Sequence, residues 1–169
     1  MKNILMVIAP VNFRDTEYIT PRAFFEQNNA KVMTASSVKK SRGRFGFEVE
    51  NDFLLSEVNP AKFSGIFLVG GGGSLDFMDN KELKDLVSDF ISSKKAVGAI
   101  CAAPRLLLNW GFLKNKSFTG WNGDSVLEKM GQENLAKFSG KAVEIDGNIL
   151  TADGPTSVEE AALNFLEIL

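Results

Sequence analysis

The sequence contains no histidine. That absence excludes metal sites ligated by imidazole, and it excludes every catalytic pair in which a histidine activates a serine or a cysteine. A second copy of the same chain cannot supply the missing group in an oligomer, because it lacks histidine as well. The composition therefore removes a large class of hydrolytic mechanisms before any motif is considered.

Cysteine is almost as scarce, with Cys101 as its single representative. One cysteine cannot form a disulfide within the chain, which fits a reducing, cytoplasmic compartment. Long hydrophobic runs are also missing: no segment reaches the ~18 apolar residues that a membrane helix needs. The apolar stretch at 3–9 is too short for a signal peptide and no small-residue cleavage site follows it. We therefore expect a cytoplasmic protein without membrane attachment.

Neither sign of charge predominates, since the net charge is only −2. Such a chain has no global basic field, and we expect no nucleic-acid partner. The basic run at 39–44 is the exception. We interpret it as a solvated loop, with an anion or partner contact as the alternative. No pattern of ligands indicates a metal or another cofactor.

The 169 residues predict one domain, 1–169, and the 44% of apolar residues, 14 of them Phe, can fill one core. Buried strands alternate with amphipathic helices along the chain, which predicts an α/β fold with a doubly wound, mostly parallel sheet sandwiched by helices. The expected strands are 3–9, 31–35, 65–69 and 97–100, and the expected helices are 16–28, about fifteen residues from 79, one after 101, and 155–169.

Two segments carry more local signals. Asp79 is the expected N-cap of the second helix, with Glu82 completing a capping box. Residues 141–145 and 149–152 are predicted to form a hairpin around the Asp-Gly turn at 146–148. Residues 45–57 stay ambiguous between an edge hairpin and a short helical turn.

Small residues surround Cys101 at the end of the 97–100 strand, in the run Gly-Ala-Ile-Cys-Ala-Ala-Pro. A tight strand-to-helix elbow needs such neighbours, and Pro104 suits the first turn of the following helix. The free amides and the dipole of that helix would lower the pKa of the thiol, giving a reactive thiolate. The alternative is a buried structural cysteine.

Two more segments are expected at the same sheet edge, beyond the carboxyl ends of neighbouring strands. The four glycines at 70–73 follow a buried strand. They are either a flexible turn or a loop whose amides face an oxyanion. Glu17 lies one turn into the first helix. It is either an ordinary exposed glutamate or a general base that shares a proton with Cys101.

Four motifs together resemble the DJ/ThiJ/PfpI superfamily over nearly the whole chain. They are Phe-Arg-Asp-Thr-Glu-Tyr-Ile-Thr-Pro at 13–21, Leu-Val-Gly-Gly-Gly at 68–72, Ala-Ile-Cys-Ala-Ala-Pro at 99–104 and Thr-Ala-Asp-Gly-Pro at 151–155. Each is weak alone, but four in order at the right separations are specific for the superfamily and not for one activity.

The resemblance implies a flavodoxin-like sandwich that forms a homodimer. It implies that Glu17 hydrogen-bonds Cys101, and that the glycine loop with Gly71 and Gly72 and the amide of Ala102 make an oxyanion site beside the sulfur. Members of the superfamily include protein deglycases, glyoxalase III-type enzymes, chaperones and intracellular peptidases.

The chain departs from the superfamily at four positions. Peptidase-like members have His where this chain has Ala102, and they often have Glu where it has Arg14. Deglycase-like members have a nearby His where Trp121 stands, and many have Arg in place of Asp153. The ring of Trp121 can wall a pocket but cannot shuttle protons.

The expected function is therefore a reaction of Cys101 with a small carbonyl compound such as methylglyoxal, with Glu17 moving the proton. The alternative is a non-enzymatic redox sensor or stress chaperone whose Cys101 oxidises to a sulfinate. Peptidase and amidotransferase activities are disfavoured, because both need a base for the thiol and an acid for the leaving amine.

Overall fold

A computed structural model describes residues 2–169 and contains one seven-stranded sheet. The strand order is β11-β12-β8-β7-β1-β3-β6, and every neighbouring pair is parallel except β11 and β12. The predicted doubly wound, flavodoxin-like architecture is confirmed. The strands of this sheet are β1 (Asn3–Val7), β3 (Lys31–Ser36), β6 (Phe53–Leu54), β7 (Gly65–Leu68), β8 (Ala96–Ile100), β11 (Val143–Asp146) and β12 (Ile149–Ala152).

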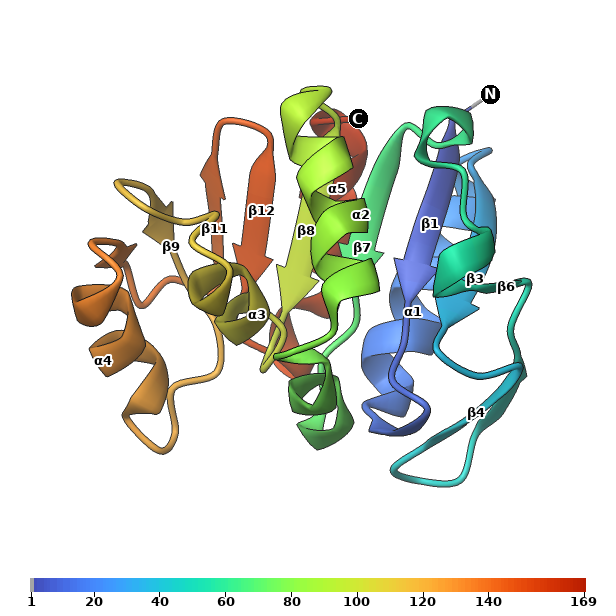
Figure 1. Cartoon of the computed structure of the whole chain (residues 1–169), viewed down its shortest axis with the longest axis horizontal. Coiled ribbons are helices and arrows are strands. Elements are labelled where there is room, and N and C mark those ends of the chain that lie inside the picture. Colours follow the sequence, from blue (N-terminus) through green and yellow to red (C-terminus); the bar gives the residue numbers. More distant parts are fainter. Residues whose placement is uncertain (1) are drawn as a thin grey trace.

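Helices cover both faces of the sheet (Figure 1). α2 and α3 lie in front of it in this view, and α1 and α5 lie behind, where they pack against each other. α4 stands outside the β11 edge of the sheet. The helices are α1 (Asp15–Gln27), α2 (Lys81–Ser92), α3 (Pro104–Asn109), α4 (Val126–Glu133) and α5 (Val158–Glu167).

Two small sheets complete the structure. β2 and β5 flank β4 in a three-stranded sheet, and β9 pairs with β10. Most of the basic run forms β4 and not a loop, with Ser41 and Gly43 buried, whereas its charged residues are exposed as expected. The ambiguous segment contains the expected helical turn at 55–57 but no hairpin of its own, because β5 pairs with β4 and β6 pairs with β3. The strands are β2 (Val11–Phe13), β4 (Lys40–Gly43), β5 (Glu48–Glu50), β9 (Ser117–Phe118) and β10 (Lys137–Phe138).

The ends of two helices differ from the prediction. Asn80 caps α2, because its side-chain oxygen accepts a 2.8 Å hydrogen bond from the amide of Leu83; Asp79 lies one residue too early, so Glu82 does not complete a capping box. A 3-10 turn occupies 155–157 before α5 begins. The predicted hairpin is confirmed, with Gly147 at a φ of 66° in its turn.

The central strands of the sheet and the helices behind it form the hydrophobic core. All residues of β7 and β8 are buried, as expected for strands covered by helices on both sides. Behind the sheet, Phe67 packs edge-on against Phe25 and Phe165, with ring centroids 5.7 and 5.3 Å apart.

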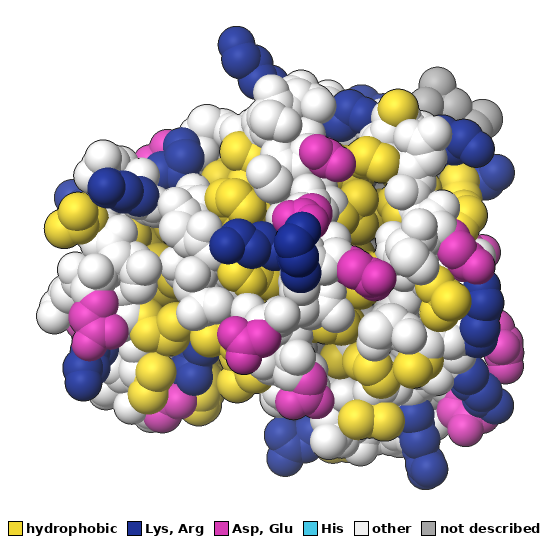
Figure 2. All heavy atoms as spheres, viewed as in Figure 1, with side chains coloured by type: hydrophobic (Ala, Val, Ile, Leu, Met, Phe, Trp, Pro, Cys, Tyr) yellow, Lys and Arg dark blue, Asp and Glu magenta, His cyan; other side chains and the backbone are white. Residues whose placement is uncertain are grey.

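Figure 2 shows acidic and basic side chains interspersed over the α2 face of the surface. Within residues 2–169, no helix has the length and apolar character to cross a membrane.

Gly98 is expected to be essential for this packing. A methyl group there would lie 2.5 Å from the ring of Phe67 and 3.0 Å from that of Phe165, so Gly98→Ala should lower the free energy of unfolding by about 1–3 kcal/mol. Urea unfolding measures the loss. Gly72→Ala is the matched control, because its added methyl meets nothing within 4 Å. Equal stabilities for the two variants would refute the close packing at Gly98.

Candidate active site

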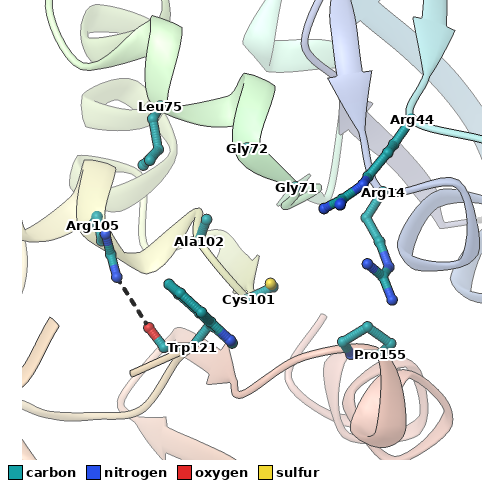
Figure 3. A pocket seen from close by; sticks show the side chains of 10 residues that line it. All are labelled: Arg14, Arg44, Gly71, Gly72, Leu75, Cys101, Ala102, Arg105, Trp121 and Pro155. Carbon is teal, nitrogen blue, oxygen red and sulfur yellow. Dashed lines mark hydrogen bonds between the residues drawn. The ribbon is translucent and has the colours of Figure 1, made fainter. Parts of the chain in front are cut away.

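Three chain segments meet at the carboxyl edge of the central sheet (Figure 3). The segment after β1 leads through β2 into α1, the glycine run follows β7, and Cys101 follows β8. Because β1, β7 and β8 are adjacent and parallel, their carboxyl ends lie side by side. The structure thus brings together the three segments that the sequence assigned to this edge.

Cys101 occupies the turn between β8 and α3 in a left-handed conformation, with a φ of 61°. Such a conformation costs a non-glycine residue about 1–3 kcal/mol and persists only when its surroundings fix it. Here the Cys101 amide donates to the carbonyl of Ala152 (2.9 Å), and its carbonyl accepts from the amide of Trp121 (2.8 Å). The predicted elbow is present, and both of its backbone groups are held.

The glycine run packs closely and is not a flexible turn. Gly71 has a φ of 95°, and a side chain there would lie 2.5 Å from the amide nitrogen of Arg14. A side chain on Gly70 would strike the carbonyl of Ile100 and the carboxyl of Glu17. The loop passes between α1 and the elbow because it has no side chains, and its Gly71 amide comes near enough to lower the pKa of the Cys101 thiol.

The backbone amides of Gly71 and Ala102 lie close enough to the sulfur of Cys101 to lower the pKa of its thiol. They are the two amides that the resemblance assigned to an oxyanion site. Both favour negative charge on the sulfur, and they suit an oxygen that becomes negative on an adjacent atom. Gly72 lines the cavity next to the sulfur, and a side chain at this position would meet nothing within 4 Å.

Glu17 lies in the first turn of α1 and is completely buried. Within residues 2–169, neither of its carboxyl oxygens has a hydrogen-bond partner of normal geometry. Burial raises the pKa of Glu17 from 4.5 to about 7, although the nearby thiol of Cys101 and the positive charge of Arg14 partly oppose the rise. The interpretation of Glu17 as an ordinary exposed glutamate is therefore wrong.

The thiol of Cys101 does not have the lowered pKa that its place before a helix predicted. Burial and, next in size, the negative charge of Glu17 raise its pKa to about 12, and the amides of Gly71 and Ala102 only moderate the rise. α3 has six residues and contributes a short dipole. At neutral pH the thiol therefore keeps its proton, whereas the carboxyl of Glu17 lies close to the midpoint of its titration.

A cavity of about 320 Å³ opens above the sulfur. Trp121 lines it, as expected of a residue that walls a pocket, and its side chain is half-exposed. Sequence reasoning gave no binding role to the three arginines of this lining, although Arg14 lay in the first-helix motif and Arg44 in the basic run. The lining consists of Arg14, Arg44, Gly71, Gly72, Leu75, Cys101, Ala102, Arg105, Trp121 and Pro155.

Asp153 does not line this cavity. It accepts a 2.6 Å hydrogen bond from the hydroxyl of Ser157 and borders a separate shallow hollow on the other side of Trp121. Its carboxylate thus stabilises the turn before α5. Within residues 2–169, no three His, Cys, Asp or Glu side chains gather closely enough to hold a metal ion.

The chain is similar to known proteins in both sequence and structure. A sequence model of the DJ-1/PfpI family matches residues 2–168. An uncharacterised protein of Methanocaldococcus jannaschii is 37% identical over 173 residues, covering 100% of this chain and 82% of the relative. Deglycase PfpI of Pyrococcus furiosus is 25% identical, covering 98% of both chains. A crystal structure of a ThiJ/PfpI domain protein from Brachyspira murdochii superposes with a TM-score of 0.92 at 29% identity, covering 98% and 95%.

The raised pKa of Glu17 predicts a pH-dependent stability. A carboxyl whose pKa is higher in the folded chain binds its proton more tightly there, so the free energy of unfolding should fall as the pH rises from 4.5 to about 7. The full change is on the order of 3 kcal/mol. Glu17→Gln removes the titrating group. The free energy of unfolding of the variant should therefore rise relative to that of the native chain as the pH increases across this range.

Chemical unfolding at several pH values measures the difference. Glu26→Gln, an exposed position in the same helix, is the control and should leave the pH dependence as it is. A constant difference between the native chain and Glu17→Gln over pH 4.5–7 would refute the buried, proton-holding carboxyl.

Proposed function

This chain belongs to the DJ-1/PfpI family, and from that premise we propose that it converts small reactive aldehydes through Cys101, with Glu17 as proton partner. One observation carries the proposal: a fully buried carboxyl without a hydrogen-bond partner faces the only thiol of a chain that has no histidine. The deglycase name of the P. furiosus relative supports aldehyde-derived substrates.

The first step is addition of the thiol to a 2-oxoaldehyde such as methylglyoxal. As the sulfur attacks the aldehyde carbon, its proton passes to the Glu17 carboxylate, whose pKa of about 7 lies near the working pH. The aldehyde oxygen gains negative charge beside the amides of Gly71 and Ala102 and is then protonated. The product is a hemithioacetal, with the ketone next to it unchanged.

The second step moves a hydrogen between two carbons. Glu17 removes the proton from the former aldehyde carbon and returns a proton to the former ketone carbon, which leaves a thioester bearing a hydroxyl group. Water hydrolyses the thioester, releasing a 2-hydroxy acid and the free thiol. The aldehyde carbon is oxidised and the ketone carbon reduced, so the sequence needs water and no external oxidant.

The redox-sensor alternative has less support from the site. Oxidation by peroxide proceeds through the thiolate, and the raised pKa of Cys101 makes that form scarce at neutral pH. A glutamate-assisted addition needs the negative sulfur only at the moment of attack. The absence of histidine, the usual base and acid of such enzymes, still disfavours peptidase and amidotransferase reactions.

We expect purified protein to convert methylglyoxal to lactate, and Cys101→Ser to abolish the conversion. Glu17→Gln should lower kcat about 100-fold or more, because a general base of this kind contributes roughly 10²–10⁴-fold. Lactate formation is measured, since consumption alone includes adducts with lysine and arginine.

Glu26→Gln is again the matched control, because it removes a carboxylate from the same helix at the surface. Native-like lactate formation by Cys101→Ser would overturn the proposed function. Sulfinate at Cys101 after mild peroxide, in a protein that makes no lactate, would favour the redox alternative instead.

A further inference from the structure

We propose that the pocket selects carbonyl compounds that carry an anionic group, a carboxylate or a phosphate, and that Arg14 and Arg44 bind that group. The proposal rests on the proposed function in taking Cys101 as the reacting group. It adds a substrate class and two specificity-determining residues that neither the family nor the reaction requires.

Arg14 and Arg44 are unneutralised cations that share one surface. Within residues 2–169, neither side chain makes an ion pair or a hydrogen bond. Both guanidinium groups lie over the ring of Phe45, at 5.2 and 5.9 Å from its centroid. Figure 3 shows both side chains at the side of the cavity opposite Trp121. Two like charges held against one ring repel each other, and an anion between them relieves that repulsion.

Arg14 adds an orphan donor to this arrangement. Its Nε atom is buried and has no hydrogen-bond partner within the described part of the chain. A buried donor without a partner destabilises the folded chain, and a ligand that accepts its hydrogen bond would remove this cost. Guanidinium groups bind carboxylates and phosphates through paired hydrogen bonds, which suits them to both anions.

The carboxyl groups near Arg14 and Arg44 do not form ion pairs with them. Asp15 accepts hydrogen bonds from the amides of Phe45 and Phe47, both at 3.0 Å, and so holds the turn that presents Arg44. The positive charge of Arg14 lowers the pKa of Glu17, but burial outweighs this effect and holds that pKa at about 7, so Glu17 is only partly charged at neutral pH. Neither carboxyl forms an ion pair with the two arginines.

Arg105 has a different role. Its side chain is 8% exposed, it pairs with Asp124 at 2.6 Å, and its guanidinium stacks over the ring of Trp121 at 5.3 Å. Its charge is thus compensated, and it braces Trp121 as the opposite wall. The free positive charge of the cavity lies with Arg14 and Arg44.

The size of the cavity limits the ligand. A volume of about 320 Å³ has room for about ten water-sized groups, since each water occupies roughly 30 Å³ in the liquid. A three-carbon aldehyde with a phosphate, or a short aldehyde with a carboxylate, fits with its carbonyl at the sulfur and its anion on the arginines.

A matched pair of alkylating reagents tests the anion site without requiring turnover. Iodoacetate and iodoacetamide differ in one charge, and each reacts when sulfur displaces iodide from carbon and the thiol proton leaves. Cys101 is the only cysteine, so mass spectrometry reports one site. We expect the iodoacetate-to-iodoacetamide rate ratio to exceed that of glutathione about tenfold or more.

Arg14→Gln and Arg44→Gln should each lower this ratio several-fold, and 0.5 M NaCl should weaken it. Arg42→Gln is the matched control, because Arg42 lies two residues from Arg44 in β4, is exposed and does not line the cavity. A ratio equal to that of glutathione, or an equal effect of Arg42→Gln, would overturn the proposal.

Turnover distinguishes the two proposals. We expect kcat/KM for 3-phosphooxy-2-oxopropanal to exceed that for methylglyoxal, with the advantage lost in Arg44→Gln. Equal turnover of both compounds without a reagent preference overturns the anion site and leaves the aldehyde reaction. A reagent preference without turnover of either compound supports the anion site and overturns the aldehyde reaction. If Cys101 reacts with neither reagent, the thiol is inaccessible and both proposals fail.

Discussion

The placement of a fully buried carboxyl beside a partly buried thiol is the constraint on which this site depends. Glu17 at the start of α1 and Cys101 after β8 meet at the carboxyl edge of the sheet, where the negative charge of Glu17 raises the pKa of the thiol. The fold must therefore bring them close while giving at most one of them a charge. The nearby amides of Gly71 and Ala102 are arranged around that requirement.

The surrounding backbone follows from the same constraint. The glycine run has to pass between α1 and the elbow, where side chains at Gly70 and Gly71 would collide with the carbonyl of Ile100 and the amide of Arg14. The left-handed Cys101 aims its sulfur into the resulting gap. Strain at the elbow is tolerable because the parallel strands on each side are buried and fully paired.

The sequence predicted the sheet, the elbow and the neighbourhood of Glu17, because buried strands, small residues and parallel connections are local or topological signals. It did not predict the pKa of the thiol, since the helix dipole is visible in sequence whereas burial is a property of the assembled layers. Arg105 carried no signal either, as its pairing with Asp124 joins segments 19 residues apart. The homodimer implied by the resemblance stays a prediction, as does a cytoplasmic location.

Asp15 has a consequence for how such a site can diverge. It attaches the turn carrying Arg44 and Phe45 to the start of α1 through two backbone amides, so the attachment does not depend on the side chains of that turn. Substitutions at Arg44 and Phe45 therefore leave the anchoring intact and lie outside the proton-sharing pair. The turn can therefore change one side of the cavity by substitution while Glu17 and Cys101 keep their positions.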